Sequence, residues 1–89
     1  MTTNKKLQHP TIHLNGSGRA ALLEQYTQAA NAARALLEAL SAASPNGRDY
    51  YPQGAAALSQ ASREHVARIE RVSEVLCEIG ELMEAVADG

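Results

Sequence analysis

Apolar residues in the C-terminal third of the chain recur at alternating intervals of four and three residues. Over residues 58–86 this spacing places them along one face of an α-helix. The members of this face are Leu58, Ser62, His65, Ile69, Val72, Leu76, Ile79, Met83 and Val86. The pattern predicts a long helix from about residue 55 to about residue 88.

The same alternation occurs earlier, over residues 22–43. Its members are Leu22, Tyr26, Ala29, Ala33, Leu36, Leu40 and Ala43, with Leu23, Ala30 and Leu37 widening the face on one side. Ser17 is a suitable N-cap because its hydroxyl can accept a backbone N–H of the first turn. Ser44-Pro45 and Asn46-Gly47 end the helix and turn the chain. We predict a helix over about 17–44 and a connection over 45–54.

Ahead of this helix, polar and apolar residues alternate. Ile12 and Leu14 have polar neighbours, which is the period of an extended chain. Pro10 disfavours a helix here, and Asn15-Gly16 marks a turn. We therefore predict a short extended arm or edge strand over residues 1–16, followed by a helical domain over 17–89.

Two long helices joined by a short connection predict an all-α fold, an antiparallel two-helix hairpin. The composition adds an expectation about assembly. The chain holds 17 alanines, only 17 Leu, Ile and Val residues together, and no Phe or Trp. A lone chain of this size buries a marginal core. We therefore expect an even-numbered homo-oligomer, most simply a dimer that forms a four-helix bundle.

The connection carries a dense group of side chains suited to binding. They are Asn46, Arg48, Asp49, Tyr50, Tyr51 and Gln53. Arg48 offers a planar set of donors for phosphate or carboxylate, and the tyrosines offer flat faces for a base. Asp49 can accept from a ribose hydroxyl or orient Arg48. Together they suit a nucleotide-like ligand. In the alternative interpretation the tyrosines cap the end of the bundle and Arg48 and Asp49 form a local ion pair.

The arm carries a second polar cluster, His9, His13 and Asn15. Two histidines four positions apart on an extended segment are too distant to share a metal ion easily, so we expect no metal site. In one hairpin the arm and the connection lie at opposite ends. An antiparallel dimer would bring the arm of one copy beside the connection of the other. We therefore predict that the two clusters, if they form one site, do so between subunits.

His65 lies on the apolar face of the second helix. We expect a hydrogen-bonded core residue or a residue that sets the register, rather than a catalytic base, with Ser62 as a candidate partner. Simple antiparallel pairing places His65 near Ala30 and Ala33. Three arginines of the same helix, Arg63, Arg68 and Arg71, are expected to face outward and pair with glutamates at helical spacings.

Charge and motifs exclude several function classes. The net charge is −2, and residues 72–89 carry five acidic and no basic side chains, which disfavours wrapping of DNA or RNA there. The chain contains neither a P-loop nor a GxGxxG motif. Glu64-His65 is not followed by the second histidine that a zincin motif requires. The lone Cys77 excludes an internal disulfide and a cysteine-based zinc site, and we expect it to be inert. We predict no enzymatic activity and no cofactor.

The segments HPTIHLNG at residues 9–16 and NGRDYYPQG at residues 46–54 resemble a group of small bacteriophage and prophage proteins. Members often read HLNGTS where this chain reads HLNGSG at residues 13–18. The resemblance spans most of the chain, and NGRDYY is its most specific part. It carries no assigned activity. By class, the chain is also similar to phage sponge proteins, small helical homo-oligomers that bind nucleotide signals of host immunity.

These observations predict a non-enzymatic binding protein that sequesters a cyclic oligonucleotide or an ADP-ribose derivative and so blocks anti-phage defence. The alternatives are a helical module that binds a host or phage protein, and a minor structural component of a phage particle. The chain shows no signal peptide and no apolar run of about 18 residues. We therefore expect a cytoplasmic protein, in the host cell if phage-encoded, without a membrane partner.

Overall fold

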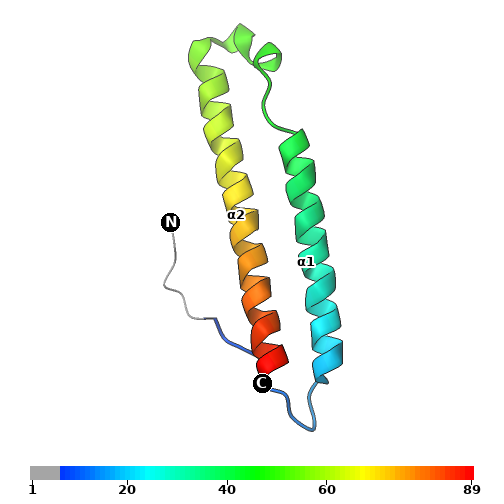
Figure 1. Cartoon of the computed structure of the whole chain (residues 1–89). Helices are drawn as coiled ribbons and strands as arrows, with labels where there is room; N and C mark the ends of the chain where they lie inside the picture. The colour runs from blue at the N-terminus through cyan, green and yellow to red at the C-terminus, as the bar shows by residue number, and fades with distance from the viewer. Residues whose placement is uncertain (1–6) are drawn as a thin grey trace.

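The computed structural model describes residues 7–89, which form two long antiparallel helices (Figure 1). Helix α1 spans Arg19–Ala42 and helix α2 spans Ala55–Asp88. Two short 3-10 turns, η1 (Gly47–Asp49) and η2 (Tyr51–Gln53), lie between them. No strand occurs in the described part of the chain. The predicted all-α hairpin is confirmed.

The start of α1 differs from the prediction. Gly18, not Ser17, is the N-cap, and no side chain caps the first turn. The Nε of Arg19 instead donates to the carbonyl oxygen of Val86, at 2.9 Å. A guanidinium at the C-terminal end of α2 also interacts favourably with that helix's dipole. The beginning of α1 is thus fastened to the end of α2.

The arm was predicted over residues 1–16, of which residues 1–6 lie outside the described residues. Residues 7–13 contain neither helix nor strand, so for the described part of the arm the edge strand is wrong. No strand in the described chain offers an edge to pair with. The arm runs beside the C-terminal end of α2 (Figure 1), and its apolar residues Leu7, Pro10 and Ile12 are half-buried. The Gly16 amide donates to the His13 carbonyl at 3.1 Å and closes a turn before α1.

Two contacts define the register of the hairpin. His65 bonds to the carbonyl of Leu40, and Arg19 bonds to that of Val86. The number of residues from Arg19 to Leu40 along α1 equals the number from His65 to Val86 along α2. One register therefore holds from one end of the hairpin to the other. The prediction that His65 lies near Ala30 and Ala33 is wrong. The two helices do not end at the same level of the hairpin, because α2 begins roughly two turns beyond the end of α1.

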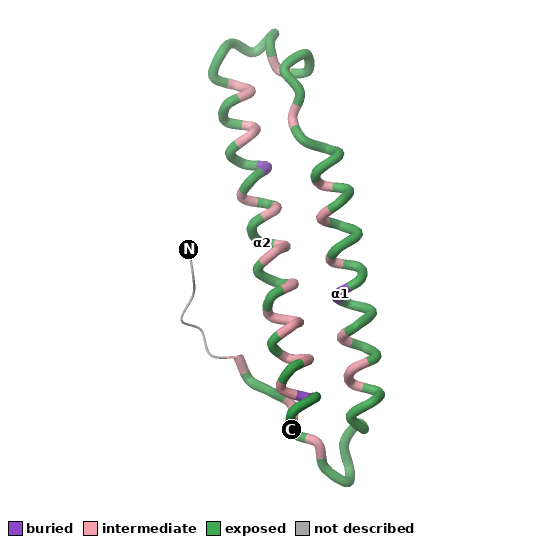
Figure 2. The backbone as a smooth tube through the Cα atoms, viewed as in Figure 1, coloured by how far each residue is buried: buried purple, intermediate pink, exposed green. Residues whose placement is uncertain are grey.

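The face that α1 presents to α2 is rotated from the predicted one. Its buried or half-buried residues are Leu22, Leu23, Tyr26, Ala30, Ala33, Leu37 and Leu40. Ala29, Leu36 and Ala43, three members of the predicted face, are exposed. All nine predicted members of the α2 face are buried or half-buried, which confirms that prediction (Figure 2).

The core between the helices is thin. Within residues 7–89 only Ala30, His65 and Val86 are buried, and Val86 is the only one below 2% exposure (Figure 2). Large apolar side chains remain in contact with water, including Leu36 in the C-terminal half of α1 and Val75 near the middle of α2. A single hairpin therefore leaves much of its apolar surface uncovered.

Candidate functional site

The connection has a defined backbone. The Asn46 side-chain oxygen accepts from the Arg48 amide at 3.0 Å, and the Gln53 amide donates to the Tyr50 carbonyl at 3.0 Å. Gly54 has φ +105°, a conformation that favours glycine, and it precedes the first residue of α2. A Cβ at Gly47 would lie 3.6 Å from Leu58 Cδ2, so η1 rests against the first turns of α2.

The binding side chains of the connection are mostly turned to solvent. Arg48 and Asp49 are exposed and form no ion pair with one another, so the local ion pair of the alternative interpretation is absent. The Tyr51 side chain is 76% exposed, whereas Tyr50 is half-buried. Of the two tyrosines, Tyr50 is therefore the one that is partly covered by the rest of the chain. The arginine and one aromatic ring are left available to a ligand.

The arm residues are held differently. His9 Nε2 lies 3.0 Å from Glu81 Oε2, which fastens the arm to α2. A Cβ built on Gly16 would lie 2.6 Å from His13 Nε2, so the His13 ring lies over the turn. Asn15 is exposed at this turn. The His9 imidazole is thus already engaged within the chain, while Asn15 and His13 face solvent.

The two predicted clusters do not meet in one chain. The connection lies at one end of the hairpin and the arm turn at the other (Figure 1), and the molecule is 61 Å long. The six connection residues share one end, and His9, His13 and Asn15 share the other. No group of three or more His, Cys, Asp or Glu side chains within residues 7–89 is arranged to hold a metal ion.

His65 is a core residue, 6% exposed. Its Nε2 lies 2.6 Å from the Leu40 carbonyl oxygen, and its Nδ1 lies 3.5 Å from Arg68 Nη1. A carbonyl only accepts and a guanidinium only donates. The His65 Nε2 therefore donates to the Leu40 carbonyl. The predicted register-setting role is consistent with this contact, but Leu40, not Ser62, is the partner.

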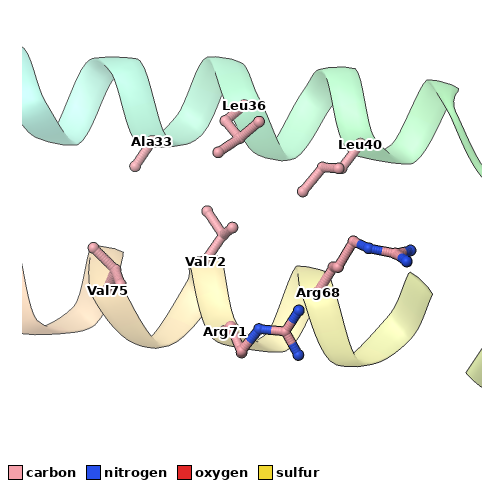
Figure 3. A pocket seen from close by; sticks show the side chains of 7 residues that line it. All are labelled: Ala33, Leu36, Leu40, Arg68, Arg71, Val72 and Val75. Carbon is pink, nitrogen blue, oxygen red and sulfur yellow. The ribbon is translucent and has the colours of Figure 1, made fainter. Parts of the chain in front are cut away.

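An apolar groove runs between the C-terminal half of α1 and the middle of α2, and the sequence interpretation missed it. Figure 3 shows its side chains, and its volume is about 420 Å³. The lining residues are Ala33, Leu36, Leu40, Val72 and Val75, with Arg68 and Arg71 at one side. The signal for it was present in the α1 pattern, where the apolar stripe is wider than one partner helix can cover.

The three arginines of α2, Arg63, Arg68 and Arg71, do not pair with glutamates as predicted. In the part of the chain that the structure describes, His9 and Glu81 are the one acid–base pair within 4 Å. Arg63 donates to the Ser59 hydroxyl at 2.9 Å, and Arg68 contacts His65. The positive charge of Arg68 and Arg71 is therefore not neutralised by a carboxylate of the described chain.

Comparison with known proteins adds no relative: no family model, curated protein or solved structure matches the chain. Within residues 7–89, neither long helix has a stretch apolar enough to cross a membrane. Cys77 is exposed.

Proposed function

We propose that the protein is a non-enzymatic binding protein whose connection takes a nucleotide-like, phosphate-bearing ligand. The observation that carries the proposal is the combination of a defined backbone with exposed binding groups at residues 46–54. Two 3-10 turns and the Asn46 cap define the backbone, while the Arg48 guanidinium and the Tyr51 ring stand in solvent. A loop ordered before binding loses less conformational entropy when the ligand arrives.

Each group has a role that follows from its chemistry. Arg48 binds a phosphate through two parallel N–H donors. Tyr51 stacks on a base, and Asp49 accepts from a ribose hydroxyl. Tyr50 and Gln53 complete the surface beside them, and Asn46 acts by positioning Arg48, since its side-chain oxygen accepts from the Arg48 amide.

The biological role that we propose is sequestration of a host immune signal, a cyclic oligonucleotide or an ADP-ribose derivative, in the host cytoplasm during phage infection. The support is the resemblance of residues 9–16 and 46–54 to phage proteins, together with the small helical architecture. Such a protein needs a binding surface and no catalytic group.

Native mass spectrometry with a panel of cyclic di- and trinucleotides and ADP-ribose derivatives tests the proposal. We expect a mass gain in proportion to the number of subunits. Arg48→Ala should abolish it, and Tyr51→Leu should weaken binding by roughly 1–3 kcal/mol for the lost stacking, whereas Tyr51→Phe keeps the ring and the affinity. Arg34→Ala, an exposed arginine that bonds only Asn31 of its own helix, is the matched control. No mass gain with any compound contradicts the proposal.

A protein partner is the second candidate, and one observation favours it. Leu14 is 98% exposed and Tyr51 is 76% exposed, and arginine and tyrosine are frequent hot-spot residues of protein interfaces. Co-purification of one stoichiometric protein, lost in Tyr51→Ala and unaccompanied by a small molecule, would establish this candidate. Presence of the chain in purified virions would instead indicate a structural component.

A further inference from the structure

We infer that a second copy of this chain docks antiparallel on the groove face, and that this dimer joins the arm of one copy to the connection of the other. The inference deepens the proposed function, on which it rests for the role of the joined residues. The pairing itself rests on the groove, the charges and the exposed area.

The surface of one chain exceeds that of a compact protein of the same mass, and the elongated hairpin leaves enough area for a partner. This surface measures 6643 Å², whereas a compact monomer of this mass exposes about 5,000 Å². The difference exceeds the roughly 800 Å² that each partner buries in a standard interface. With only three buried residues within 7–89, the hairpin gains stability from covering its open face.

The groove face is the apolar part of this surface. Leu36 is 46% exposed and Val75 is 50% exposed, one on each helix, and both line the groove (Figure 3). Ala29 and Ala43 extend the same flank of α1 toward its two ends, since they lie seven residues before and after Leu36. Their small side chains allow another helix to approach closely.

The position of the groove suits a second copy of the same chain. Helix α2 spans 55–88, so its midpoint lies between Arg71 and Val72, within the groove. A two-fold axis through this point places α2 of the second copy in full antiparallel overlap, and the same patch then serves both copies. An axis elsewhere along the helix would leave one end of each hairpin without a partner.

The charges along α2 favour the antiparallel direction. Residues 55–71 carry three arginines and two glutamates, whereas residues 72–88 carry five acidic side chains and no basic one. Antiparallel pairing places Arg68 and Arg71 beside the acidic half of the second copy, near its Glu74 and Glu78. Parallel pairing would set the two acidic halves against each other.

This arrangement completes the site. Within residues 7–89, Leu14 and Tyr51 are the two most exposed of the large apolar side chains. Leu14 belongs to the arm and Tyr51 to the connection, and these two segments lie at opposite ends of one hairpin (Figure 1). In the dimer, Leu14 of one copy lies at the same end as Tyr51 of the other. The arm turn then supplies His13 and Asn15 to the ligand surface around Arg48, which one chain alone cannot do.

Sedimentation velocity with two matched variants tests the interface. Val75 and Val66 are on the same helix and are 50% and 53% exposed, but nine residues apart they lie on opposite sides of it. We expect the wild-type chain to sediment as a dimer, Val75→Arg as a monomer, and Val66→Arg as a dimer. A monomeric wild-type chain overturns the inference, as does a Val66→Arg effect equal to or larger than that of Val75→Arg. Circular dichroism confirms that both variants remain helical.

Cross-linking tests the direction of pairing and the joined site. In a Cys77→Ser background, chains carrying Leu14→Cys are mixed with chains carrying Gln53→Cys and treated with a short bismaleimide. We expect a covalent dimer from the mixture and none from either chain alone. Cross-linking of Leu14→Cys to itself would indicate a parallel dimer. The absence of a cross-link in the mixture would show that the arm of one copy does not lie beside the connection of the other. Either result overturns the inference.

Both experiments are done without ligand, so their outcome is independent of the nucleotide assay. Arg48→Ala keeps the groove intact and should remain a dimer while losing ligand. A dimer that binds no nucleotide supports the assembly and contradicts the proposed function. A monomer that still binds nucleotide supports the proposed function and contradicts the assembly.

Discussion

Substitutions at His65 can separate the contribution of packing from that of hydrogen bonding at one buried position of the hairpin. The His65 ring is 6% exposed and joins α2 to the last turn of α1 through the Leu40 carbonyl, at 2.6 Å. That carbonyl also accepts from the Ala43 amide at 3.0 Å, so it keeps one partner when the imidazole is removed. The penalty for an unsatisfied buried group therefore does not apply.

His65→Ala removes a buried ring and one hydrogen bond. A net hydrogen bond contributes about 1 kcal/mol, and the lost packing of a buried ring adds about 1–2 kcal/mol, so we expect a loss of about 2–3 kcal/mol. His65→Leu restores most of the volume without the donor, and we expect it to lose less than about 1 kcal/mol. His65→Gln keeps a donor at a similar reach and should lie between the two.

Urea denaturation followed by circular dichroism measures these differences, at one fixed protein concentration because association stabilises the folded chain. For a domain of this size, about 2 kcal/mol corresponds to a decrease of roughly 10 °C in Tm. The reasoning is refuted if His65→Leu destabilises as much as His65→Ala. In that case the bond to Leu40 dominates over the packing.

Three further substitutions test other contacts. Arg19→Ala removes the bond to the last turn of α2 and should lower the free energy of unfolding by about 1 kcal/mol. Arg34→Ala is the control, because it removes only a bond within α1, and it should change the free energy of unfolding by less than about 0.5 kcal/mol. Gly54→Ala places a side chain at φ +105° and should lower the urea midpoint by the equivalent of about 1–3 kcal/mol; an unchanged midpoint would contradict the strain argument. His9→Ala removes a half-exposed contact with Glu81 and should cost at most about 1 kcal/mol, but it should release the arm, which limited proteolysis detects.

The two helices and their order could be predicted from the sequence because helical periodicity is a local property. The nine-residue face of α2 was confirmed in full, since a run of four-and-three spacing over so many turns leaves no other face to bury. The chemistry of the connection was also visible, because its residue types cluster in nine consecutive positions. Their exposure and the absence of an Arg48–Asp49 ion pair were not visible, since both depend on side-chain orientation.

The register and the exposed flank were decided only by the tertiary structure. The sequence alone predicted that His65 lies near Ala30 and Ala33, because symmetric pairing was assumed; the structure pairs it with Leu40, because α2 begins beyond the end of α1. Likewise, the apolar stripe of α1 is wide enough to pack against α2 on one side and to leave a second side open. Which half faces α2, and which half remains open with Leu36 in the groove, depends on how the two helices pack against each other. Periodicity thus determines which residues share a helix face, and packing determines which partner covers them.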